Sequence, residues 1–584
     1  MKHHYTRVEF LGGNNKDKIG ANAQLLTHQD ETGNITHILF DLGALFFQSE
    51  RENLSFTPDI LKYLVYLPNK NNQSPLLKKY YLEERAKFNK YPQKPLLDAV
   101  FLTHMHEDHI GGLVNLIKAG FLFPPIYASL ETLSVLSRIL IEHNVENMPE
   151  MHPISGPVHL SKNVIVTPFM VSHTVAGAIG FHTLTKYDGK EYAGLLHLGD
   201  FNLSDVIVGT GYQKEAFKNL INSLFITHVF MDSTSSFNLD EKQLTFQESV
   251  QNYKKIMVQS SKRIITAVIS RSTQNMASIL KAAQESGRTV FIDGFMQRLV
   301  YDSLKQYGFM DAFQGTVYQH EDVTKGDISS YLKDIPLSKQ VVILSGAFAE
   351  GFSNTQTGAQ QSGLVKVAKG VHSHLKLDER SLVVLSQRAI PVPSIVNDMQ
   401  QMVEKLAQLS SNQVIQNKAP DSKSLGDFEM VPLQRTGHAS LSEIKEILTD
   451  IRLYRKNKED KLFLIPVHGD KAQLEQTLSV SEQTGVLGVL AENDTLLGLS
   501  AHDVISQPTL KAKKRWLSFE EASDGVGLTQ SAFKIDLYEE TEQNGQVVYQ
   551  KVQSLGAQRV QILANKNKAL LKRILYHTLE RYKS

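Results

Sequence analysis

The sequence predicts an α/β protein with more than one domain, and three observations support this. The chain has 584 residues, too many for one ordinary domain, and 41% of them are hydrophobic, enough for sizeable cores. From about residue 222, apolar runs of strand length alternate with helix-length segments, which is typical of a parallel α/β domain. Outside that stretch, several apolar strands end in histidine or aspartate, where sheet enzymes place their ligands.

Composition excludes several classes of protein. The net charge of +1 argues against a globally basic nucleic-acid-binding surface, although a local basic groove is compatible with it. The chain has no cysteine, which excludes disulfides, thiolate nucleophiles and cysteine zinc sites and fits a reducing cytoplasm. Its first residues, MKHHYTRVEFLGG, lack the apolar core of a secretory signal, and no stretch approaches about 18 uninterrupted apolar residues. We therefore expect a soluble cytoplasmic enzyme with no membrane partner.

The expected elements follow in chain order. Strands are expected at 8–11, 37–42, 96–102, 164–168 and 194–198, with a helical excursion inserted at 48–95 and a helix at 113–119. The α/β pattern then comprises strands at 229–231, 263–268, 289–292, 340–344 and 381–385 and helices at 245–259 and 273–286. After a polar stretch at 418–426, a strand is expected at 462–465. Residues 511–584 hold 13 basic and 8 acidic residues and end in an expected amphipathic helix at 566–582.

Residues 101–112, FLTHMHEDHIGG, contain the most informative pattern of the chain. Alternate residues of an extended segment point the same way, so His104 and His106 can bind one metal ion. Asp108 and His109 can then turn towards a second ion. Imidazole nitrogens and a carboxylate suit Zn²⁺ or Mn²⁺ and leave coordination positions open for water. The two glycines that follow would allow a tight bend into the helix at 113–119.

Further ligands are expected because a two-metal centre needs about six or seven nitrogen and oxygen ligands, one of them bridging. His173, Asp200 and His468 each follow an apolar strand, and the carboxylate of Asp200 could bridge both ions. His197 lies inside an apolar strand and is interpreted as a core histidine. Other histidines lack such a context and are interpreted as surface or structural residues: His3, His4, His28, His143, His152, His372 and His374.

Together these residues resemble the metallo-β-lactamase fold, whose order is matched by Asp41 in Phe-Asp-Leu-Gly, the motif at 104–109, His173 and Asp200. Three further segments resemble the additional motifs of its β-CASP nucleases: Asp232-Ser233-Thr234, Gly437-His438-Ala439-Ser440 and Pro466-Val467-His468-Gly469. Within that family ribonuclease J is the most similar, over roughly residues 8–507. The resemblance implies a metallo-β-lactamase αββα sandwich with an inserted α/β β-CASP domain and a small C-terminal region.

The resemblance also implies a division of the chain and an activity. Residues 1–222 would form the first part of the metallo-β-lactamase domain, 223–425 the β-CASP domain, 426–507 the return segment of the first domain and 508–584 the C-terminal region. The active site would lie in the cleft between the two domains. There the enzyme would hydrolyse RNA phosphodiester bonds with water activated by two divalent ions, Zn²⁺ or Mn²⁺.

Roles for individual residues follow from the same resemblance. One ion would be held by His104, His106 and His173, the other by Asp108, His109 and His468, with Asp200 bridging them. Asp41 would orient the ligand histidines from behind, and Asp232 would form part of the scaffold beside the site. An aspartate at a strand end followed by hydroxyls is also a common helix cap, which is the alternative for Asp232.

The predicted catalytic residues are Asp108, Asp200 and His438. A histidine titrates near neutrality, so His438 could protonate the departing ribose oxygen or contact phosphate. A histidine at a helix start that only packs on a neighbour is the alternative. Gly437, His438, Ala439 and Ser440 are predicted to contact the substrate phosphate, with the glycine allowing close approach.

Two departures from ribonuclease J concern how the substrate is held. The motif His-x-Ser-Gly-His corresponds here to Gln434-Arg435-Thr436-Gly437-His438, and Thr-Gly-Ser-Gln-Gly-Glu corresponds to Ser345-Gly346-Ala347-Phe348-Ala349-Glu350. The second replacement removes polar groups. Exonuclease and endonuclease modes therefore both stay open at this point.

Three alternative functions are compatible with part of the sequence pattern. A DNA nuclease of the same superfamily is the closest, because a contact to the RNA 2′-hydroxyl leaves no simple signature in sequence. A hydrolase of a small ester, lactam or thioester would not need the large insertion or the motifs at His438 and His468. A catalytically silent RNA-binding member would not need intact ligands at every position.

The C-terminal region, residues 508–584, is predicted to mediate self-association, as a homodimer or homotetramer, or to assist RNA capture. Its modestly basic composition includes Trp516 beside Lys511, Lys513, Lys514 and Arg515. Basic side chains on phosphates make RNA binding salt-dependent, and an apolar helix face favours a dimer. A packed appendage that merely covers the first domain is the alternative.

Overall fold

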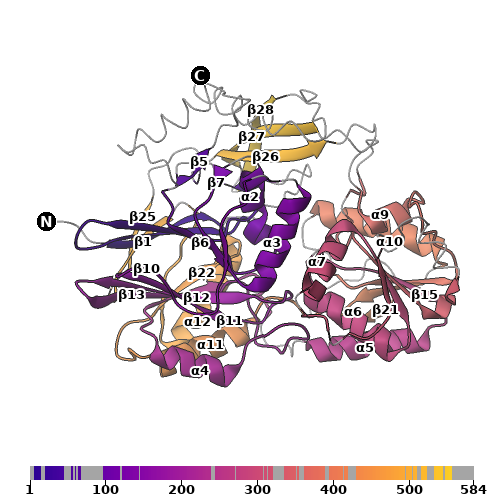
Figure 1. The fold of residues 1–584 in the computed structure, drawn as a ribbon, viewed down its shortest axis with the longest axis horizontal. Helices are drawn as coiled ribbons and strands as arrows, with labels where there is room; N and C mark the ends of the chain where they lie inside the picture. The colour runs from indigo at the N-terminus through magenta and orange to yellow at the C-terminus, as the bar shows by residue number, and fades with distance from the viewer. Residues whose placement is uncertain are drawn as a thin grey trace.

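Two domains lie side by side in the computed structural model, with a third, smaller sheet over the first of them (Figure 1). The structure describes residues 5–555 with gaps, the longer ones at 45–53, 67–95, 320–333, 354–360, 419–428 and 523–531. The first domain is built from both the N-terminal part of the chain and residues that follow the inserted second domain.

The first domain contains two facing sheets. The eight-stranded sheet runs in the order β25 (Val504–Pro508), β24 (Thr495–Leu499), β1 (Tyr5–Gly12), β2 (Ala23–Gln29), β3 (Ile35–Phe40), β6 (Ala99–Phe101), β8 (Ile126–Ala128) and β9 (Met151–Pro153). The seven-stranded sheet runs in the order β10 (Val158–Ser161), β11 (Val164–Met170), β12 (Ile179–Tyr187), β13 (Lys190–His197), β14 (His228–Asp232), β22 (Phe463–Val467) and β23 (Leu487–Gly488).

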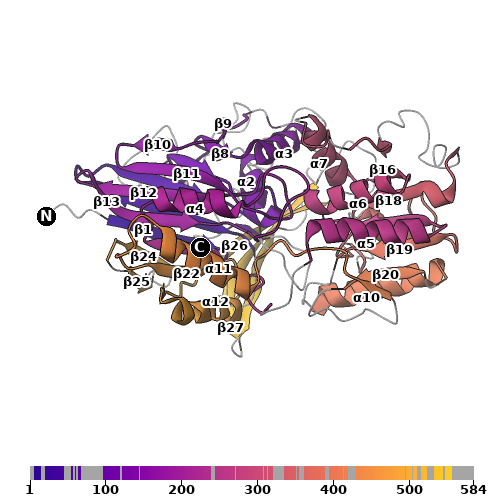
Figure 2. The same ribbon diagram turned by 90° about the horizontal axis from the view of Figure 1, so that it is seen from below.

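Alternation along these strands fills the space between the two sheets. Phe40 of β3 packs 5.8 Å from Phe181 of β12, and Phe10 lies 6.1 Å from Phe230, measured between ring centroids. The intervening residues face outwards and pack on helices. On the first sheet these helices are α2 (Glu107–Lys118) and α3 (Leu130–Glu142), and on the second they are α4 (Lys214–Ser223), α11 (Leu441–Tyr454) and α12 (Lys471–Thr484). The layers are those of the expected αββα sandwich (Figure 2).

The second domain is a seven-stranded sheet in which every neighbouring pair is parallel. Its order is β17 (Val317–Gln319), β16 (Thr289–Asp293), β18 (Gln340–Leu344), β15 (Arg263–Ala267), β19 (Ser381–Leu385), β20 (Val414–Asn417) and β21 (Glu429–Val431). One face packs on α5 (Phe246–Gln259), α6 (Thr273–Glu285) and α7 (Phe295–Gln306), the other on α9 (Gly363–Ala368) and α10 (Pro393–Leu409). Ile264 and Ile265 of β15 enter opposite cores, which explains why the strands read as continuous apolar runs.

Strand pairing places the limits of the inserted domain at other residues than those expected from the sequence. β14 pairs in parallel with β13 and β22, so it belongs to the first domain although it lies within 223–425. β21 pairs with β20 of the second domain although it lies within 426–507. The chain therefore leaves the first domain after Asp232 and returns after Val431. A buried parallel strand has the same apolar pattern in either sheet, so sequence alone could not assign β14.

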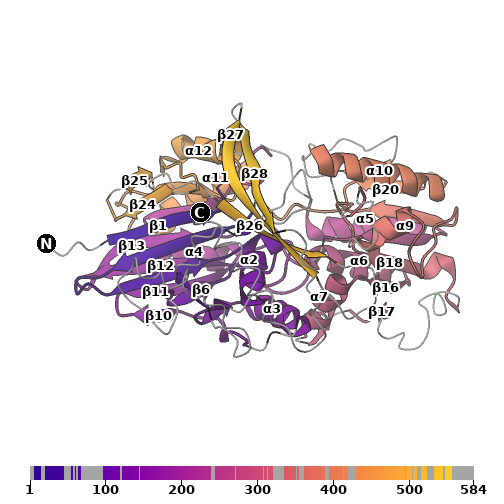
Figure 3. The ribbon, with the colours of Figure 1, turned by 90° about the horizontal axis from the view of Figure 1, so that it is seen from above.

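A third, four-stranded antiparallel sheet joins two distant parts of the chain (Figure 3). It contains β28 (Gln546–Leu555), β27 (Ala532–Gln543) and β26 (Arg515–Ala522), and β26 pairs with β4 (Leu54–Phe56). Of the expected helical excursion at 48–95, the described part includes β4 and β5 (Val65–Tyr66), and β5 pairs with β7 (Phe121–Leu122). Ile60, Tyr63 and Leu64 of the same excursion are buried in the core. Its other residues and the helix expected at 566–582 lie outside the described residues.

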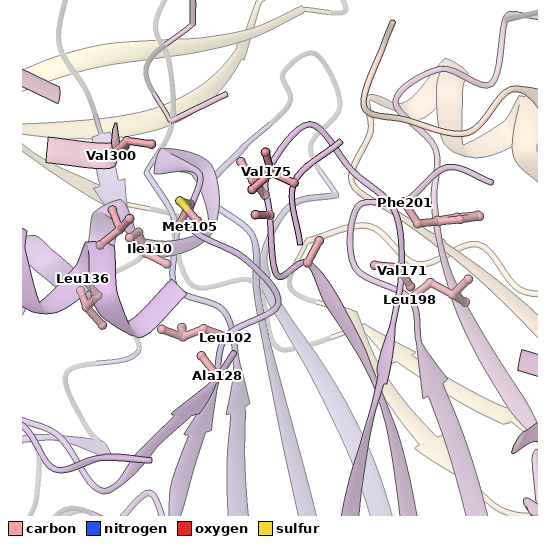
Figure 4. Close-up of a cluster of buried hydrophobic side chains, with 14 of the residues drawn as sticks. Leu102, Met105, Ile110, Ala128, Leu136, Val171, Val175, Leu198, Phe201 and Val300 are labelled. Carbon is pink, nitrogen blue, oxygen red and sulfur yellow. The ribbon is translucent and has the colours of Figure 1, made fainter. Parts of the chain in front are cut away.

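The two large domains share an apolar core. Val300 of α7 belongs to the same buried cluster as Met105, Ile110 and Leu136 of the first domain, and α3 packs against α7 (Figure 4). An apolar contact of this kind favours one fixed arrangement of the domains over a hinge. Among the helices that the structure describes, none combines the length and the apolar character needed to cross a membrane.

Candidate metal centre

The motif at 104–109 spans the turn between β6 and the start of α2. The helix begins at Glu107, six residues before the expected start at residue 113, so Gly111 lies inside it and does not form the predicted bend. A Cβ atom on Gly111 would lie 2.4 Å from Oε1 of Glu107 and 2.9 Å from Cβ of Ala44. Packing of the motif against its neighbours therefore requires the glycine.

Three histidines and one aspartate form the first group of candidate ligands. Nδ1 of His106 lies 3.0 Å from Nε2 of His104 and 3.1 Å from Nε2 of His173. Oδ2 of Asp200 lies 3.8 and 3.9 Å from those Nε2 atoms of His104 and His173. The structure thus brings together all four residues that the sequence assigned to one ion. We refer to them as group one.

The second group contains Asp108, His109 and His468 and shares Asp200 with the first. Oδ2 of Asp108 lies 3.0 Å from Nε2 of His468 and 3.8 Å from Nε2 of His109. Nε2 of His109 lies 3.2 Å from Oδ2 of Asp200, the same oxygen that faces group one. We refer to this set as group two. Asp200 lies where a bridging ligand is expected.

The donor atoms fit divalent cations. In group one His106 Nδ1 faces two other ring nitrogens, an arrangement in which hydrogen bonds alone leave lone pairs opposed and a cation between them would accept all three. Four ligand histidines use their second ring nitrogen for a protein partner: His104 with Thr103 (3.0 Å), His109 with Asp41 (2.7 Å), His173 with Gly437 O (2.8 Å) and His468 with Thr234 (2.8 Å). Such partners fix ring orientation at metal sites. The site is therefore suited to divalent metal ions.

The two groups differ in their protonation. Burial, together with the neighbouring histidines, lowers the pKa of His104 and His106 well below its usual value, and burial lowers that of His173 to about 4. In group two, burial opposes protonation as well, but nearby carboxylates prevail. Asp200 is the strongest of them, and the pKa of His468 is raised to about 10 and that of His109 well above its usual value. In the absence of metal, these pKa shifts favour neutral rings for the three histidines of group one. They favour protonated rings for His109 and His468 of group two.

Asp41 contacts the motif from behind. Its carboxylate accepts hydrogen bonds from the backbone N–H and the hydroxyl of Thr103, both at 2.8 Å, and it bonds His109. The residue is fully buried and its backbone is left-handed, with φ 56°. His468 has a similar φ of 57°. For residues other than glycine this conformation is uncommon, and here both instances aim a side chain at the site.

Asp232 connects two histidines and caps no helix. Oδ2 lies 2.7 Å from Nδ1 of His438, and Oδ1 lies 3.2 Å from Nδ1 of His468. Thr234, which the sequence did not single out as a positioning residue, donates its N–H to the same carboxylate. Burial opposes protonation of His438, but Asp232 and Asp200 raise its pKa above the usual value. About a fifth of the His438 side chain is exposed, so it can reach a substrate.

The other predicted phosphate contacts have different tasks in the structure. A Cβ atom on Gly437 would lie 2.3 Å from Cε1 of His173, so the space that its missing side chain leaves is taken by a ligand histidine, not by substrate. Ala439 is buried. Ser440 is the N-cap of α11, where its side chain accepts from the Glu443 N–H in a capping box. Phosphate contacts from these three residues stay a prediction, and their side-chain positions are taken by contacts within the protein. The pattern Ser-x-x-Glu was visible in the sequence and could have predicted the cap.

The histidines assigned to structural roles that the structure describes lie outside the two ligand groups. His197 is buried between Phe40 and Phe230, with ring centroids 5.6 and 5.9 Å away, and it hydrogen-bonds Gln24. Three others bond ordinary neighbours: His28 with Thr6, His152 with Glu150, and His372 with Asp293. His3 and His4 lie outside the described residues.

Two segments of the chain match known domains. Residues 80–208 match the beta-lactamase superfamily domain, and residues 261–406 match the beta-CASP domain of ribonuclease J. The first segment holds the ligands from His104 to Asp200, and the second holds most of the parallel sheet described above. The fold is therefore that of a metallo-β-lactamase domain at residues 80–208 and of an inserted β-CASP domain at residues 261–406.

Several bacterial proteins are similar over most of the chain. Ribonuclease J of Mycoplasma pneumoniae is 21% identical over 410 residues, covering 70% of this chain and 62% of that protein. Ribonuclease J 1 of Streptococcus pyogenes is 24% identical over 376 residues, covering 64% and 58%. Ribonuclease J2 of Bacillus subtilis is 21% identical over 391 residues, covering 66% and 61%. The chain thus spans about three fifths of the length of these curated relatives.

Proposed function

Because the chain is a ribonuclease J-like member of the metallo-β-lactamase and β-CASP proteins, we propose that it is a metal-dependent ribonuclease that hydrolyses RNA phosphodiester bonds. One observation carries the proposal. Two groups of nitrogen and oxygen ligands share Asp200, and a partly exposed histidine held by a buried carboxylate lies beside them. A shared carboxylate and an adjacent proton donor suit the hydrolysis of a phosphodiester by a two-metal mechanism.

The proposed cofactor is a pair of divalent ions, Zn²⁺ or Mn²⁺. Their proposed ligands are His104, His106, His173, Asp108, His109, His468 and the shared Asp200. Imidazole nitrogens and carboxylates suit both metals. When bound, such ions lower the pKa of coordinated water towards 7 and screen the negative charge of a phosphate.

His438 is the proposed general acid. Its raised pKa keeps the imidazole protonated near neutral pH, and Asp232 fixes the ring by holding Nδ1. The opposite ring nitrogen is then free to donate a proton to the ribose 3′-oxygen as that oxygen leaves. Asp108 and Asp200 act by holding the reaction centre in place, and Asp41 and Asp232 act by orienting the ligand histidines.

Partners and location complete the proposal. The substrate is RNA, the location is the cytoplasm, which the absence of cysteine supports, and the active form is a homodimer or homotetramer. The C-terminal region, 508–584, is proposed to mediate this association or to assist RNA capture. Its basic excess supports the second task.

One assay tests the function. Purified protein is incubated with Mn²⁺ or Zn²⁺ and with end-labelled 5′-monophosphate RNA, 5′-triphosphate RNA, circular RNA and matched DNA. We expect metal-dependent cleavage of RNA in preference to DNA. Cleavage of circular RNA identifies endonuclease action, and dependence on the 5′ group identifies attack from that end. Preference for DNA, or cleavage of none of these substrates by metal-loaded protein, overturns the proposal.

A further inference from the structure

Four consecutive residues of the inserted domain, Arg271–Gln274, lie between β15 and the first turn of α6 and reach into the first domain. We call them the interdomain clamp. Arg271 donates from Nη1 to the backbone oxygen of Met105 at 3.0 Å, and its Nη2 lies 2.6 Å from Oε2 of Glu107. Met105 and Glu107 are the two intervening residues of His-x-His-x-Asp-His. The arginine side chain is buried, whereas about a third of the Glu107 side chain is exposed.

The next residues of the clamp bind two other loops of the first domain. The hydroxyl of Thr273 accepts from the N–H of Ala176 at 2.6 Å, and the N–H of Gln274 donates to Thr174 O at 2.9 Å. The Gln274 side chain accepts from the N–H groups of Ile207 and Val208 and donates to Val208 O, at 2.7–3.1 Å. Gln274 is fully buried.

These three loops together carry every ligand of group one. Met105 lies between His104 and His106, Thr174 follows His173, and Ile207 lies seven residues after Asp200. Group two shares Asp200, and its Asp108 and His109 follow Glu107. Its fourth ligand, His468, has Thr234 and Asp232 as ring partners and not a residue of the clamp.

The backbone conformation at the start of α6 suits the contacts with the first domain better than it suits the start of a helix. Arg271 has a left-handed backbone, with φ 72°, which is uncommon for a residue with a side chain. Ser272 stands at the N-cap position, but its side chain makes no capping hydrogen bond. The N–H of Gln274, one of the first-turn groups without a helical partner, bonds Thr174 O of the other domain. Contacts across the domain boundary therefore hold a backbone conformation that is unusual at the start of a helix.

We propose that the interdomain clamp is a positioning device through which the inserted domain sets the geometry of group one, so that affinity for the ion of group one depends on that domain more strongly than affinity for the other ion. The inference rests on the proposed metal centre and goes beyond it, because it gives the inserted domain a part in metal binding. Partners behind metal ligands typically change affinity by about 10–100-fold.

The test measures Zn²⁺ affinity of the full chain by competition with a chromophoric chelator. The variants are Arg271→Ala and Gln274→Ala, and Arg271→Lys keeps the charge without the forked contact to Met105 and Glu107. We expect each to lower the affinity for one ion roughly 10–100-fold and the affinity for the other by a smaller factor, with the lysine variant intermediate. Thr234→Val, which removes the hydroxyl beside Nδ1 of His468, should lower mainly the affinity for the other ion.

Arg288→Lys is the matched control. Arg288 is also a buried arginine of the inserted domain, but its side chain bonds backbone oxygens within that domain, including Met257 O. We expect it to lower the melting temperature without changing either Zn²⁺ affinity. The visible spectrum of Co²⁺-loaded protein gives a second readout, in which clamp variants should change the signal of one ion.

The outcomes separate the two proposals. If the unmodified chain does not bind two Zn²⁺ ions, the metal centre itself is wrong, and the clamp inference falls with it. If it binds two ions, and the clamp variants weaken both equally or neither, the clamp inference alone is overturned. If Arg271→Ala does not fold, Gln274→Ala and Arg271→Lys decide the question by the same criterion. RNA cleavage enters none of these readouts.

Discussion

One carboxylate oxygen of Asp232 lies 2.7 Å from Nδ1 of His438, although 206 residues separate the two in sequence. The other oxygen lies 3.2 Å from His468. Asp232 therefore fixes a candidate metal ligand and a candidate proton donor at the same time. It raises the pKa of His438 against the effect of burial, which favours a protonated ring at neutral pH.

Replacing this carboxylate should weaken proton donation. We expect Asp232→Asn to lower kcat for RNA cleavage by about 100-fold or more, within the range usual for general acid–base catalysis. Because the asparagine no longer raises the pKa of His438, the alkaline limb of the pH–rate profile should move to lower pH. Asp188→Asn, at an exposed turn, is the control and should leave both quantities unchanged. An unchanged pH profile in Asp232→Asn would exclude His438 as the acid.

Removal of a group-two ligand should abolish activity without unfolding the protein. The side chain of Asp108, in the first turn of α2, is partly exposed and is not part of a hydrophobic core. We expect Asp108→Ala to lose several orders of magnitude in rate, because metal activation and charge stabilisation supply most of the barrier reduction. Circular dichroism and RNA cleavage at saturating Mn²⁺ check this. Substantial cleavage by the metal-loaded variant would contradict the two-ion proposal.

Gly437 should tolerate no side chain. In Gly437→Ala the new Cβ would lie 2.3 Å from the ring of His173, so the ring must move and group one must distort. We expect a loss of affinity for one Zn²⁺ ion of roughly 10-fold or more, by analogy with lost support behind a metal ligand. Gly156→Ala is the control, because no atom lies within 4 Å of its added Cβ. Equal affinities in the two variants would show that His173 is not a ligand.

Metal binding should depend on pH mainly through group two. Without metal, the raised pKa values of His109 and His468 keep both rings protonated at pH 7, and a ring must lose its proton to bind metal. Affinity for that ion should therefore rise with pH between 6 and 9, by about tenfold per pH unit for each proton released. His173, whose pKa is lowered to about 4, is already neutral there, so the other ion should respond little. Titration calorimetry in buffers of different ionisation heat measures the released protons, and equal release for both ions would refute the assignment.

Truncation tests the C-terminal region. A chain ending at Gln507 lacks β26, the partner of β4, together with a segment of 13 basic and 8 acidic residues. We expect a smaller assembly by light scattering and a shallower dependence of RNA affinity on salt, because fewer phosphates are neutralised. If the shortened chain keeps both its mass per assembly and its salt dependence, the region does neither job.

The seven candidate ligands could be predicted from sequence because each follows an apolar strand, and the ends of neighbouring strands meet at one edge of a sheet. His173 after β11 and Asp200 after β13 lie in one sheet, and the motif that begins at His104 follows a strand of the facing sheet. Each ligand therefore has a local signal, and the fold brings the signals together. The alternation of strands and helices in the inserted domain is also visible in the sequence of that segment alone.

What could not be predicted depends on contacts between distant residues. Asp232 has the local pattern of a helix cap, and its partner His438 is known only once β14 and the loop before α11 are placed together. The pairing of β26 with β4 joins residues more than 450 positions apart, and the amino-acid composition does not indicate it. Arg271 has no motif at all. Its role follows from a left-handed backbone and an ion pair across a domain boundary.

The direct pairing of β14 with β22 has a consequence for how the protein is made. These neighbouring strands are separated in the gene product by the whole inserted domain, and His468 follows β22 immediately. At about 5–20 residues per second, a ribosome needs roughly 10–50 s to travel from the first strand to the second. During that interval the nascent chain already holds six of the seven candidate ligands but cannot complete group two. The proposed two-ion centre therefore stays incomplete until His468 has been added to the chain.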